Sequence, residues 1–190
     1  MHSQIVIGMD EVGRGCWAGP LVVGAVALGK PIEGLRDSKQ LSRRQRERLV
    51  PAIESTAIAW SLGWVAPQDI DRLGLTAGIQ LAYERALEGL ELEPAEIIID
   101  GSYNFLPDAS GVRTLVHADS LIPAVSAASI LAKVARDTFM REMAGFYPGY
   151  GFERHVGYGT AVHRDALQRL GTSELHRSSF RPVQLVQGLA

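Results

Sequence analysis

The chain lacks the features that would tie it to an oxidising compartment or to a membrane. Its single cysteine, Cys16, cannot form an internal disulfide, which agrees with a reducing environment. No apolar run approaches the ~18 residues of a membrane span. The N-terminal stretch MHSQIVIGMD also lacks a basic region followed by a long apolar segment. We therefore expect a cytoplasmic protein that does not enter a membrane.

The chain also lacks an excess of charge of one sign, since its formal net charge is −2 at pH 7. A global attraction to polyanions is therefore not indicated. The distribution of the basic residues is more informative, because the arginines gather in two clusters. These are Arg43, Arg44, Arg46 and Arg48, and then Arg154, Arg164, Arg169, Arg177 and Arg181. A phosphate backbone could lie against either cluster, and a solvated protein face is the alternative interpretation.

The composition is that of an ordinary globular protein, with 46% hydrophobic, 21% charged and 7% aromatic residues. A chain of 190 residues can bury one sizeable core. We expect a single domain over residues 1–190. After Gly145 the composition shifts toward Gly, His, Tyr and Arg, and we expect residues 145–190 to pack on that domain as a C-terminal extension around a helix from Thr160 to Leu170.

Short apolar runs alternate with helical patterns along the chain. Residues 4–9, 20–28 and 56–65 are typical of strands and predict an antiparallel meander. The third run places large side chains on one face and small ones on the other. Residues 95–100 (AEIIID) predict a strand buried on both faces, and residues 112–118 predict another strand that leads into Asp119.

Helices are expected between these strands. Ser42 and Gln45 have the spacing of a capping box at the start of LSRRQRERLVPAIE, and Pro51 should bend or end that helix. A short helix should open at Pro67, and a longer one should bury the stripe of Leu75, Ile79, Ala82, Ala86 and Leu90. A further helix should start at Ser126 and stop near Gly145. Strands followed by alternating strands and helices predict a mixed α/β sheet flanked by helices.

Acidic residues stand at the ends of the predicted strands. Asp10 follows one apolar run with Glu11 beside it, Asp100 ends a second run, and Asp119 follows a third. Strand ends gather at one edge of an open α/β sheet, where ligand sites form. Carboxylates brought together repel each other unless cations lie among them, and an oxygen-only set favours Mg²⁺ or Mn²⁺. Two such ions would suit phosphoryl transfer. The alternative is that these acids simply reach water at strand ends.

Six motifs together resemble the ribonuclease HII family, the bacterial type 2 ribonucleases H. They are DEVGRG at 10–15, DSKQL at 37–41, IIDG at 98–101, ADS at 118–120, SAASILAKVARD at 126–137 and HVGYGTAVH at 155–163. The resemblance implies a ribonuclease H-like sheet and a catalytic metal site formed by Asp10, Glu11, Asp100 and Asp119. It also implies cleavage of RNA in RNA–DNA hybrids and nicking of DNA on the 5′ side of an embedded ribonucleotide, which leaves 3′-hydroxyl and 5′-phosphate ends and begins ribonucleotide removal.

The same resemblance suggests which residues bind the substrate. Gly13, Arg14 and Gly15 correspond to a ribonucleotide-sensing loop, in which glycines let the backbone approach a 2′-hydroxyl closely. Tyr158 corresponds to a tyrosine that packs against the sugar of the next nucleotide, and Lys39 to a lysine near the phosphates. For Glu11 to join Asp10 in one cluster, we expect the chain to turn between them.

The chain departs from the family pattern at His117 and Val156, where the family has lysine. Lys133 and Asp137, four residues apart on a helix, are left outside the site as a local ion pair. The C-terminal VQLVQGLA faintly resembles a sequence that binds a sliding clamp, and an exposed terminus is the alternative. We expect a monomer.

Three other functions fit parts of the pattern. A type 1 ribonuclease H or a junction resolvase could carry a similar set of acids. A hybrid-binding module that has lost its chemistry would not need all four acids. A small-molecule phosphatase would leave the arginine clusters and Tyr158 unexplained.

Overall fold

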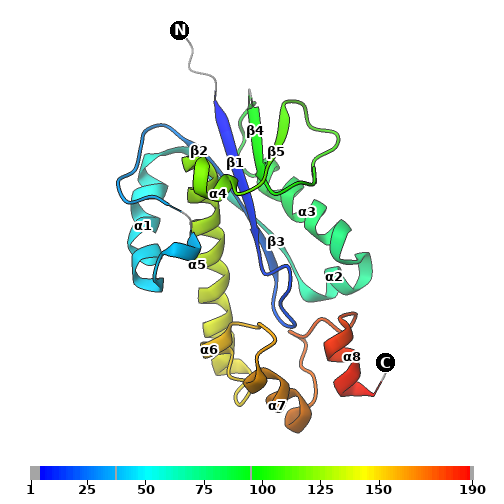
Figure 1. The fold of residues 1–190 in the computed structure, drawn as a ribbon. Helices are drawn as coiled ribbons and strands as arrows, with labels where there is room; N and C mark the ends of the chain where they lie inside the picture. The colour runs from blue at the N-terminus through cyan, green and yellow to red at the C-terminus, as the bar shows by residue number, and fades with distance from the viewer. Residues whose placement is uncertain (1–4, 37, 95, 189–190) are drawn as a thin grey trace.

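The computed structural model describes residues 5–36, 38–94 and 96–188, which form a mixed sheet with helices on both faces (Figure 1). The sheet has five strands in the spatial order β3-β2-β1-β4-β5. The first three form the expected antiparallel meander, and β4 and β5 run parallel to β1. The strands are β1 (Val6–Val12), β2 (Leu21–Leu28), β3 (Ala57–Val65), β4 (Glu96–Asp100) and β5 (Val112–Leu115). The predicted mixed α/β sheet is confirmed.

The pairing of β1 with β4 determines where two of the acids lie. Gly8 is opposite Ile98 and Met9 is opposite Ile99 in this parallel pair. One residue further along each strand stand Asp10 and Asp100. The two aspartates therefore lie side by side at the carboxyl edge of the sheet, where ligand sites form in open α/β sheets.

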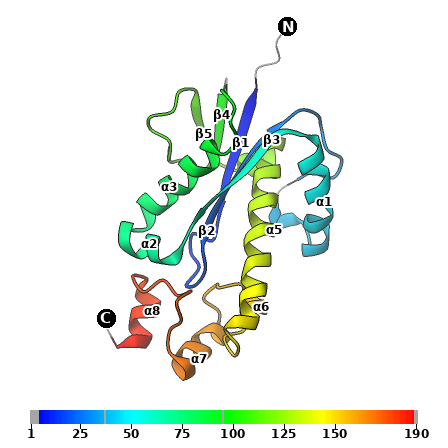
Figure 2. The ribbon, with the colours of Figure 1, turned by 180° about the vertical axis from the view of Figure 1, so that it is seen from behind.

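Two groups of helices cover the two faces of the sheet (Figures 1 and 2). On one face, α3 packs over β2 and β3, its expected stripe shares one core with residues of β1 and β4, and the short α2 precedes it. On the other face, α5 lies against β1 and β2, and α1 packs beside it. These helices are α1 (Arg43–Thr56), α2 (Pro67–Leu73), α3 (Leu75–Glu88) and α5 (Pro123–Phe146). In the part of the chain that the structure describes, no helix is both long and apolar enough to cross a membrane.

Helix α5 approaches the sheet so closely that side chains on the strand would block it. A Cβ atom on Gly8 would lie 2.2 Å from the backbone of Ala124 and Val125, and one on Gly24 would lie 2.3 Å from the carbonyl oxygen of Ala128. Glycine at these two positions lets the helix backbone rest directly on β1 and β2. This close packing brings Ser129 of α5 within hydrogen-bonding distance of Asp10 on β1.

The sequence did not indicate which face of β3 is buried, and the structure buries the face with small side chains. A Cβ on Gly63 would lie 1.9 Å from the Ala82 carbonyl oxygen, whereas Ile58 and Trp60 are exposed. Helix α1 has the predicted capping box but continues through Pro51 to Thr56. Pro51 lies on the exposed side, where water can hydrate the carbonyl that its missing N–H leaves unpaired.

The segment before α5 also differs from the prediction. The strand expected over 112–118 ends at Leu115, and Ala118–Leu121 forms a short helix, α4, that carries Asp119. Helix α5 then begins at Pro123 rather than at Ser126, with proline in its first turn as helix starts permit. Two carbonyl groups, those of Asp119 and Ile122, accept from the Ser126 hydroxyl, so this residue ties α4 to α5.

The C-terminal part packs at one end of the sheet, beside the loop between β1 and β2 (Figures 1 and 2). Backbone N–H groups of residues 17, 18 and 19 in this loop donate to the carbonyls of Gly157 and Leu175. The helix expected from Thr160 is confirmed as α7, with Thr160 as its cap, and two short helices were not predicted. The three elements are α6 (Phe152–His155), α7 (Ala161–Leu170) and α8 (Arg181–Gln187).

Candidate active site

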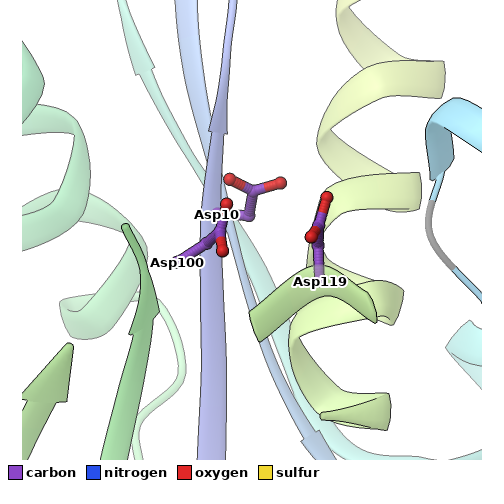
Figure 3. Close-up of side chains that lie close together, drawn as sticks. All are labelled: Asp10, Asp100 and Asp119. Carbon is purple, nitrogen blue, oxygen red and sulfur yellow. The ribbon is translucent and has the colours of Figure 1, made fainter. Parts of the chain in front are cut away.

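Three aspartates come together at the carboxyl edge of the sheet. Asp10 lies on β1, Asp100 ends β4, and Asp119 lies in the first turn of α4. One carboxylate oxygen from each lies within 4.8 Å of the others, and Figure 3 shows the three carboxyl groups facing one another. Asp10 and Asp100 therefore lie side by side at the sheet edge as predicted, while Asp119 lies at the start of a helix rather than at a strand end.

Short contacts hold two of these acids in place. The backbone N–H of Ala118 donates to Asp100 Oδ1 at 2.7 Å, which joins the end of β4 to the start of α4. Lys39 Nζ lies 2.8 Å from Asp119 Oδ2. His117, in the left-handed region at φ 61°, makes the turn that presents Asp119, and its own side chain is exposed. His117 is therefore a turn residue, not the strand residue that was expected.

Asp10 is the acid whose charge is most strongly disfavoured. Its exposed fraction is 8%, and burial raises the pKa of Asp10 to about 8, with Glu11, Asp100 and Asp119 adding repulsion. The Ser129 hydroxyl hydrogen bond opposes this rise. Ser129 Oγ is in turn 2.9 Å from Ser38 Oγ, so two serines from different segments back the carboxylate. A cation among the three acids would remove the repulsion, and an all-oxygen set suits a hard divalent ion.

Glu11 is held on the opposite side of β1 from Asp10. The expected turn between the two acids does not occur, because β1 continues through both of them to Val12. Successive strand side chains point to opposite faces, so Asp10 faces α5 and Glu11 faces α3. There Glu11 Oε2 accepts from the Tyr83 phenol at 2.7 Å, and Arg14 Nη1 lies 3.5 Å from Oε1. Glu11 is outside the three-aspartate cluster, and its role as a metal ligand stays a prediction.

A cavity of about 380 Å³ opens above the acids and gathers most of the predicted site. Its volume is in the range of ligand-binding clefts. Eight of the predicted site residues line it together with Lys133, Arg46 and two serines. Asp119 does not line the cavity, but its carboxylate lies beside those of Asp10 and Asp100. The eight predicted residues that line the cavity are Asp10, Glu11, Gly13, Arg14, Gly15, Lys39, Asp100 and Tyr158. The two serines are Ser38 and Ser129.

The two glycines of the loop have different structural reasons to be glycine. Gly13 has φ +89°, and a Cβ there would lie 2.3 Å from Arg136 Nε and 2.8 Å from the Pro20 carbonyl oxygen. Its identity is thus required by backbone conformation and by the packing behind it. Nothing lies within 4 Å of the position that a Cβ on Gly15 would take. Close approach of a ligand is therefore a reason for glycine at position 15, whereas conformation and packing already explain Gly13.

Lys133 is a cavity residue that sequence reasoning left out. It forms the predicted ion pair with Asp137 at 3.1 Å. Its ammonium also lies 5.0 Å from the centre of the Tyr158 ring, over a ring that is 37% exposed. The signal that could have found it is its helical spacing from Ser129, which places both side chains on the face of α5 that lines the cavity.

The arginine clusters divide into exposed and structural members. Arg46 lines the cavity and donates to the carbonyls of Ser38 and Leu41. Arg177 is 0% exposed and cannot meet a phosphate, so its inclusion in the basic surface was wrong. Val156, which departs from the family pattern, is buried with φ 44° and offers no basic group. The remaining C-terminal members, which are exposed, are Arg154, Arg164, Arg169 and Arg181.

Comparison with known sequences gives one consistent answer. The family model described as Ribonuclease HII matches residues 7–183. The chain is 49% identical to a ribonuclease HII of Halorhodospira halophila, over 96% of this chain and 95% of the relative. It is also 49% identical to a ribonuclease HII of Thermus thermophilus, over 94% of this chain and 87% of the relative.

Solved structures resemble the fold over nearly the full length. Ribonuclease H2 from Pyrococcus horikoshii has a TM-score of 0.82 at 27% identity, covering 96% of this chain and 97% of that one. The ribonuclease HII in a complex with PCNA from Archaeoglobus fulgidus has a TM-score of 0.78 at 25% identity, covering 93% and 95%. Bst-RNase HIII in complex with Mn²⁺ has a TM-score of 0.77 at 26% identity, covering 99% of this chain and 70% of that one. The matched family model, the identities and the shared fold agree with the gathered acids, and the chain belongs to the ribonuclease HII family, whose members are metal-dependent endoribonucleases.

Proposed function

We propose that this protein hydrolyses RNA in RNA–DNA hybrids and nicks DNA duplexes on the 5′ side of a single embedded ribonucleotide. The products would carry 3′-hydroxyl and 5′-phosphate ends, so the reaction would begin ribonucleotide removal from DNA. The observation that carries the proposal is one cavity lined by Gly15, Tyr158 and two aspartates, Asp10 and Asp100, whose carboxylates cluster with that of Asp119. A nuclease that must recognise one 2′-hydroxyl needs both the metal-binding acids and a close backbone contact.

The donor set fits Mg²⁺ or Mn²⁺. The three clustered side chains offer oxygen alone. Burial, with added repulsion from the neighbouring acids, raises the pKa of Asp10 to about 8, and a divalent ion would favour the ionised carboxylate. The structure of Bst-RNase HIII in complex with Mn²⁺ supports the same choice. Asp10, Asp100 and Asp119 would hold the ions, and Glu11, which lines the same cavity, would be a fourth ligand. When bound, two such ions would activate water and stabilise both the attacking and the leaving oxygen.

The other cavity residues would orient the nucleic acid. Lys39 and Lys133 would contact phosphates next to the scissile bond, since both line the cavity as cations. Gly15 would let the loop backbone reach the 2′-hydroxyl, with Gly13 and Arg14 shaping the loop around it. The exposed face of Tyr158 would pack against the sugar of the following nucleotide, where a second 2′-hydroxyl would not fit.

Three broader features belong to the same proposal. Residues 1–190 would form one catalytic domain, because the C-terminal part is joined to the loop after β1 by backbone hydrogen bonds. The protein would act as a cytoplasmic monomer on RNA–DNA hybrids and ribonucleotide-containing DNA. A sliding clamp would be a further partner through α8, in which Leu185 is 56% exposed, and the PCNA complex of the Archaeoglobus structure supports this.

A labelled DNA duplex with one ribonucleotide tests the proposal. The wild type would be compared with Asp100→Asn in Mg²⁺, in Mn²⁺ and in EDTA. Asp108→Asn is the matched control, because Asp108 is an exposed acid outside the cavity. We expect a metal-dependent nick just 5′ of the ribonucleotide with the wild type and with Asp108→Asn, and none with Asp100→Asn.

The other outcomes identify the competing functions. Cleavage of long hybrids alone would indicate type 1 behaviour. Binding of the duplex without any cleavage would indicate a hybrid-binding module. Hydrolysis of small phosphate esters without nicking would indicate a phosphatase. Each of these results would contradict the proposed function.

A further inference from the structure

Two buried arginines lie directly behind the loop that carries Gly13, Arg14 and Gly15. Arg136 belongs to α5, and Arg177 belongs to the segment between α7 and α8. Both side chains are 0% exposed, which is unusual for arginine. The cavity above the acids does not include them among its lining residues, so neither can act on a substrate by touching it.

The guanidinium groups donate to backbone carbonyls of the loop. Arg177 Nη1 donates to the Arg14 carbonyl at 3.1 Å, and its Nε and Nη2 donate to the Gly19 carbonyl at 3.1 and 2.9 Å. Arg136 Nε donates to the Pro20 carbonyl at 2.9 Å, and its Nη2 donates to the Ala18 carbonyl at 3.1 Å. The two side chains thus fix four carbonyl groups of one short loop.

Arg136 also joins this loop to the segment that carries Tyr158. Its Nη1 donates to the Val156 carbonyl at 2.9 Å, and its guanidinium carbon lies 5.7 Å from the centre of the Tyr158 ring. A Cβ on Gly157 would lie 2.2 Å from the Ala18 carbonyl oxygen, so the two segments touch through backbone. Arg136 therefore holds the two walls of the cavity relative to each other, together with the backbone hydrogen bonds from residues 17 and 18 to Gly157.

Carboxylates do not account for these buried charges. Among residues 5–36, 38–94 and 96–188, the nearest carboxylate contact of Arg136 is Asp137 at 3.8 Å, and no ion pair within 4.0 Å involves Arg177. Burial lowers the pKa of Arg177 to about 10, which leaves the group charged at neutral pH. Burying an arginine costs free energy that carbonyl hydrogen bonds only offset, so an anchoring role explains them better than a contribution to stability.

The direction of these hydrogen bonds determines which backbone N–H groups of the loop can point toward the cavity. The peptide bonds of the described residues are trans, so the N–H of Gly15 points opposite to the Arg14 carbonyl of the same peptide unit. Because Arg177 draws that carbonyl toward the interior, the Gly15 N–H points away from it. Gly15 itself lines the cavity and has open space around it.

We propose that Arg177 and Arg136 are positioning residues for ribonucleotide recognition, which orient the peptide units of the loop so that a backbone donor faces the 2′-hydroxyl. This inference rests on the proposed function and adds to it the residues that set its specificity. Arginine is needed for this role because its planar fork reaches two carbonyls at once, whereas a lysine ammonium is a point charge.

The test compares Arg177→Lys and Arg136→Lys with the wild type, at a temperature well below their measured unfolding midpoints. Steady-state KM and kcat would be measured on the single-ribonucleotide duplex, with the all-DNA duplex as a competing inhibitor. Arg85→Lys is the control, because Arg85 is an exposed arginine that also donates to a backbone carbonyl, that of Trp64, which lies outside the loop.

We expect KM for the ribonucleotide duplex to rise about fivefold to tenfold in Arg177→Lys, the effect of one lost hydrogen bond. The inhibition constant of the all-DNA duplex should stay unchanged, so the preference for a 2′-hydroxyl falls. A purely structural role would instead lower the active fraction and leave KM and this preference as in the wild type, and that result would overturn the inference.

A measurement on the wild type covers the case in which both variants fail to fold. Amide hydrogen exchange of Trp17, Ala18 and Gly19 without substrate should be slow, as in the central strands, if the loop is anchored. Fast exchange there would overturn the inference. Absence of nicking by the wild type would overturn the proposed function and this inference together, whereas nicking with equal KM in all variants would overturn this inference alone.

Discussion

The phenol of Tyr83 donates to Oε2 of Glu11 at 2.7 Å and holds that carboxylate on the α3 side of β1. Burial raises the pKa of Tyr83 well above its ordinary value, so the phenol keeps its proton for this hydrogen bond. The Tyr83 ring stacks on Phe105 with a centre-to-centre distance of 5.2 Å. Helix α3, on the face of the sheet opposite α5, thus orients an acid near the three-aspartate cluster.

Replacing Tyr83 with Phe should weaken metal use without unfolding the protein. The ring and its stacking on Phe105 remain, but Glu11 loses the donor that orients it. Partners that orient metal ligands typically change metal affinity or activity about 10-fold to 100-fold, and we expect the half-saturating Mn²⁺ concentration for nicking to rise by about 10-fold. Tyr103→Phe is the control, since the Tyr103 side chain is 59% exposed. An unchanged Mn²⁺ titration would argue that Glu11 is not a ligand.

Alanine should destabilise the protein at Gly13 but not at Gly15. Gly13→Ala must adopt φ +89° and meet Arg136, so the free energy of unfolding should fall by more than ~1 kcal/mol. Gly15→Ala enters open space, and the free energy of unfolding should change by less than ~0.5 kcal/mol.

Gly15→Ala should lose nicking activity although it keeps its stability. A methyl group at Gly15 would hold the substrate away from the loop, and misplacement of this kind lowers rates by about 10-fold to 100-fold. Denaturant unfolding and nicking of the single-ribonucleotide duplex measure the two quantities. If Gly15→Ala nicks as fast as the wild type, the loop does not approach the 2′-hydroxyl at this position.

The apparent metal affinity should increase with pH up to about pH 8. Burial and the neighbouring acids raise the pKa of Asp10 to about 8, so below that pH a proton competes with the metal for this carboxylate. Affinity should rise by up to about tenfold per pH unit between pH 6 and 8 and level off above it. Mn²⁺ titration by calorimetry, with Asp108→Asn as a control and Asp10→Asn to remove the effect, measures this slope. A flat profile would mean that Asp10 is already ionised at pH 6.

A buried histidine pair should make stability fall in acid. His163 Nε2 is 3.0 Å from His176 Nε2, and Ser173 N–H donates to His176 Nδ1, so His176 donates its Nε2 hydrogen to His163. Desolvation by burial lowers the pKa of each of these two side chains to about 4. A proton added to Nε2 of His163 would leave two N–H donors facing each other across the 3.0 Å contact with His176.

The sign of this effect follows from the lowered values. Between about pH 6.5 and pH 4 the unfolded chain binds more protons than the folded one, so each histidine reduces stability by up to ~1.4 kcal/mol per pH unit as pH falls. The raised pKa of Asp10 acts in the opposite direction below pH 8, so a difference measurement is needed.

That measurement compares the wild type with His163→Gln by denaturant unfolding at pH 7.5 and pH 5. We expect the wild-type advantage to shrink at pH 5, because glutamine does not titrate. His117→Gln is the control, since His117 is exposed and lies outside the buried pair. A wild-type advantage that is equal at both pH values would contradict the neutral pair.

The sequence by itself determined the strands, the main helices and the identity of the acids. Apolar runs of the right length specify strands through local alternation, and the capping box at Ser42 and Gln45 is a contact within four residues. The six motifs identified the ribonuclease HII family, which the family model confirms over residues 7–183. Asp10 and Asp100 could be placed at one edge because parallel strand ends meet there.

Only the tertiary structure decided which side each group faces and what lies behind it. The turn expected at Glu11 fails because β1 continues in pairing with β2, which puts Glu11 opposite Val23 and its side chain toward Tyr83. Arg177 looked like a surface cation, but its partners are the carbonyls of Arg14 and Gly19, more than 150 residues away in sequence. Periodicity reports a residue's own neighbours along the chain, whereas burial of a charge depends on hydrogen-bond partners that only the folded chain brings near.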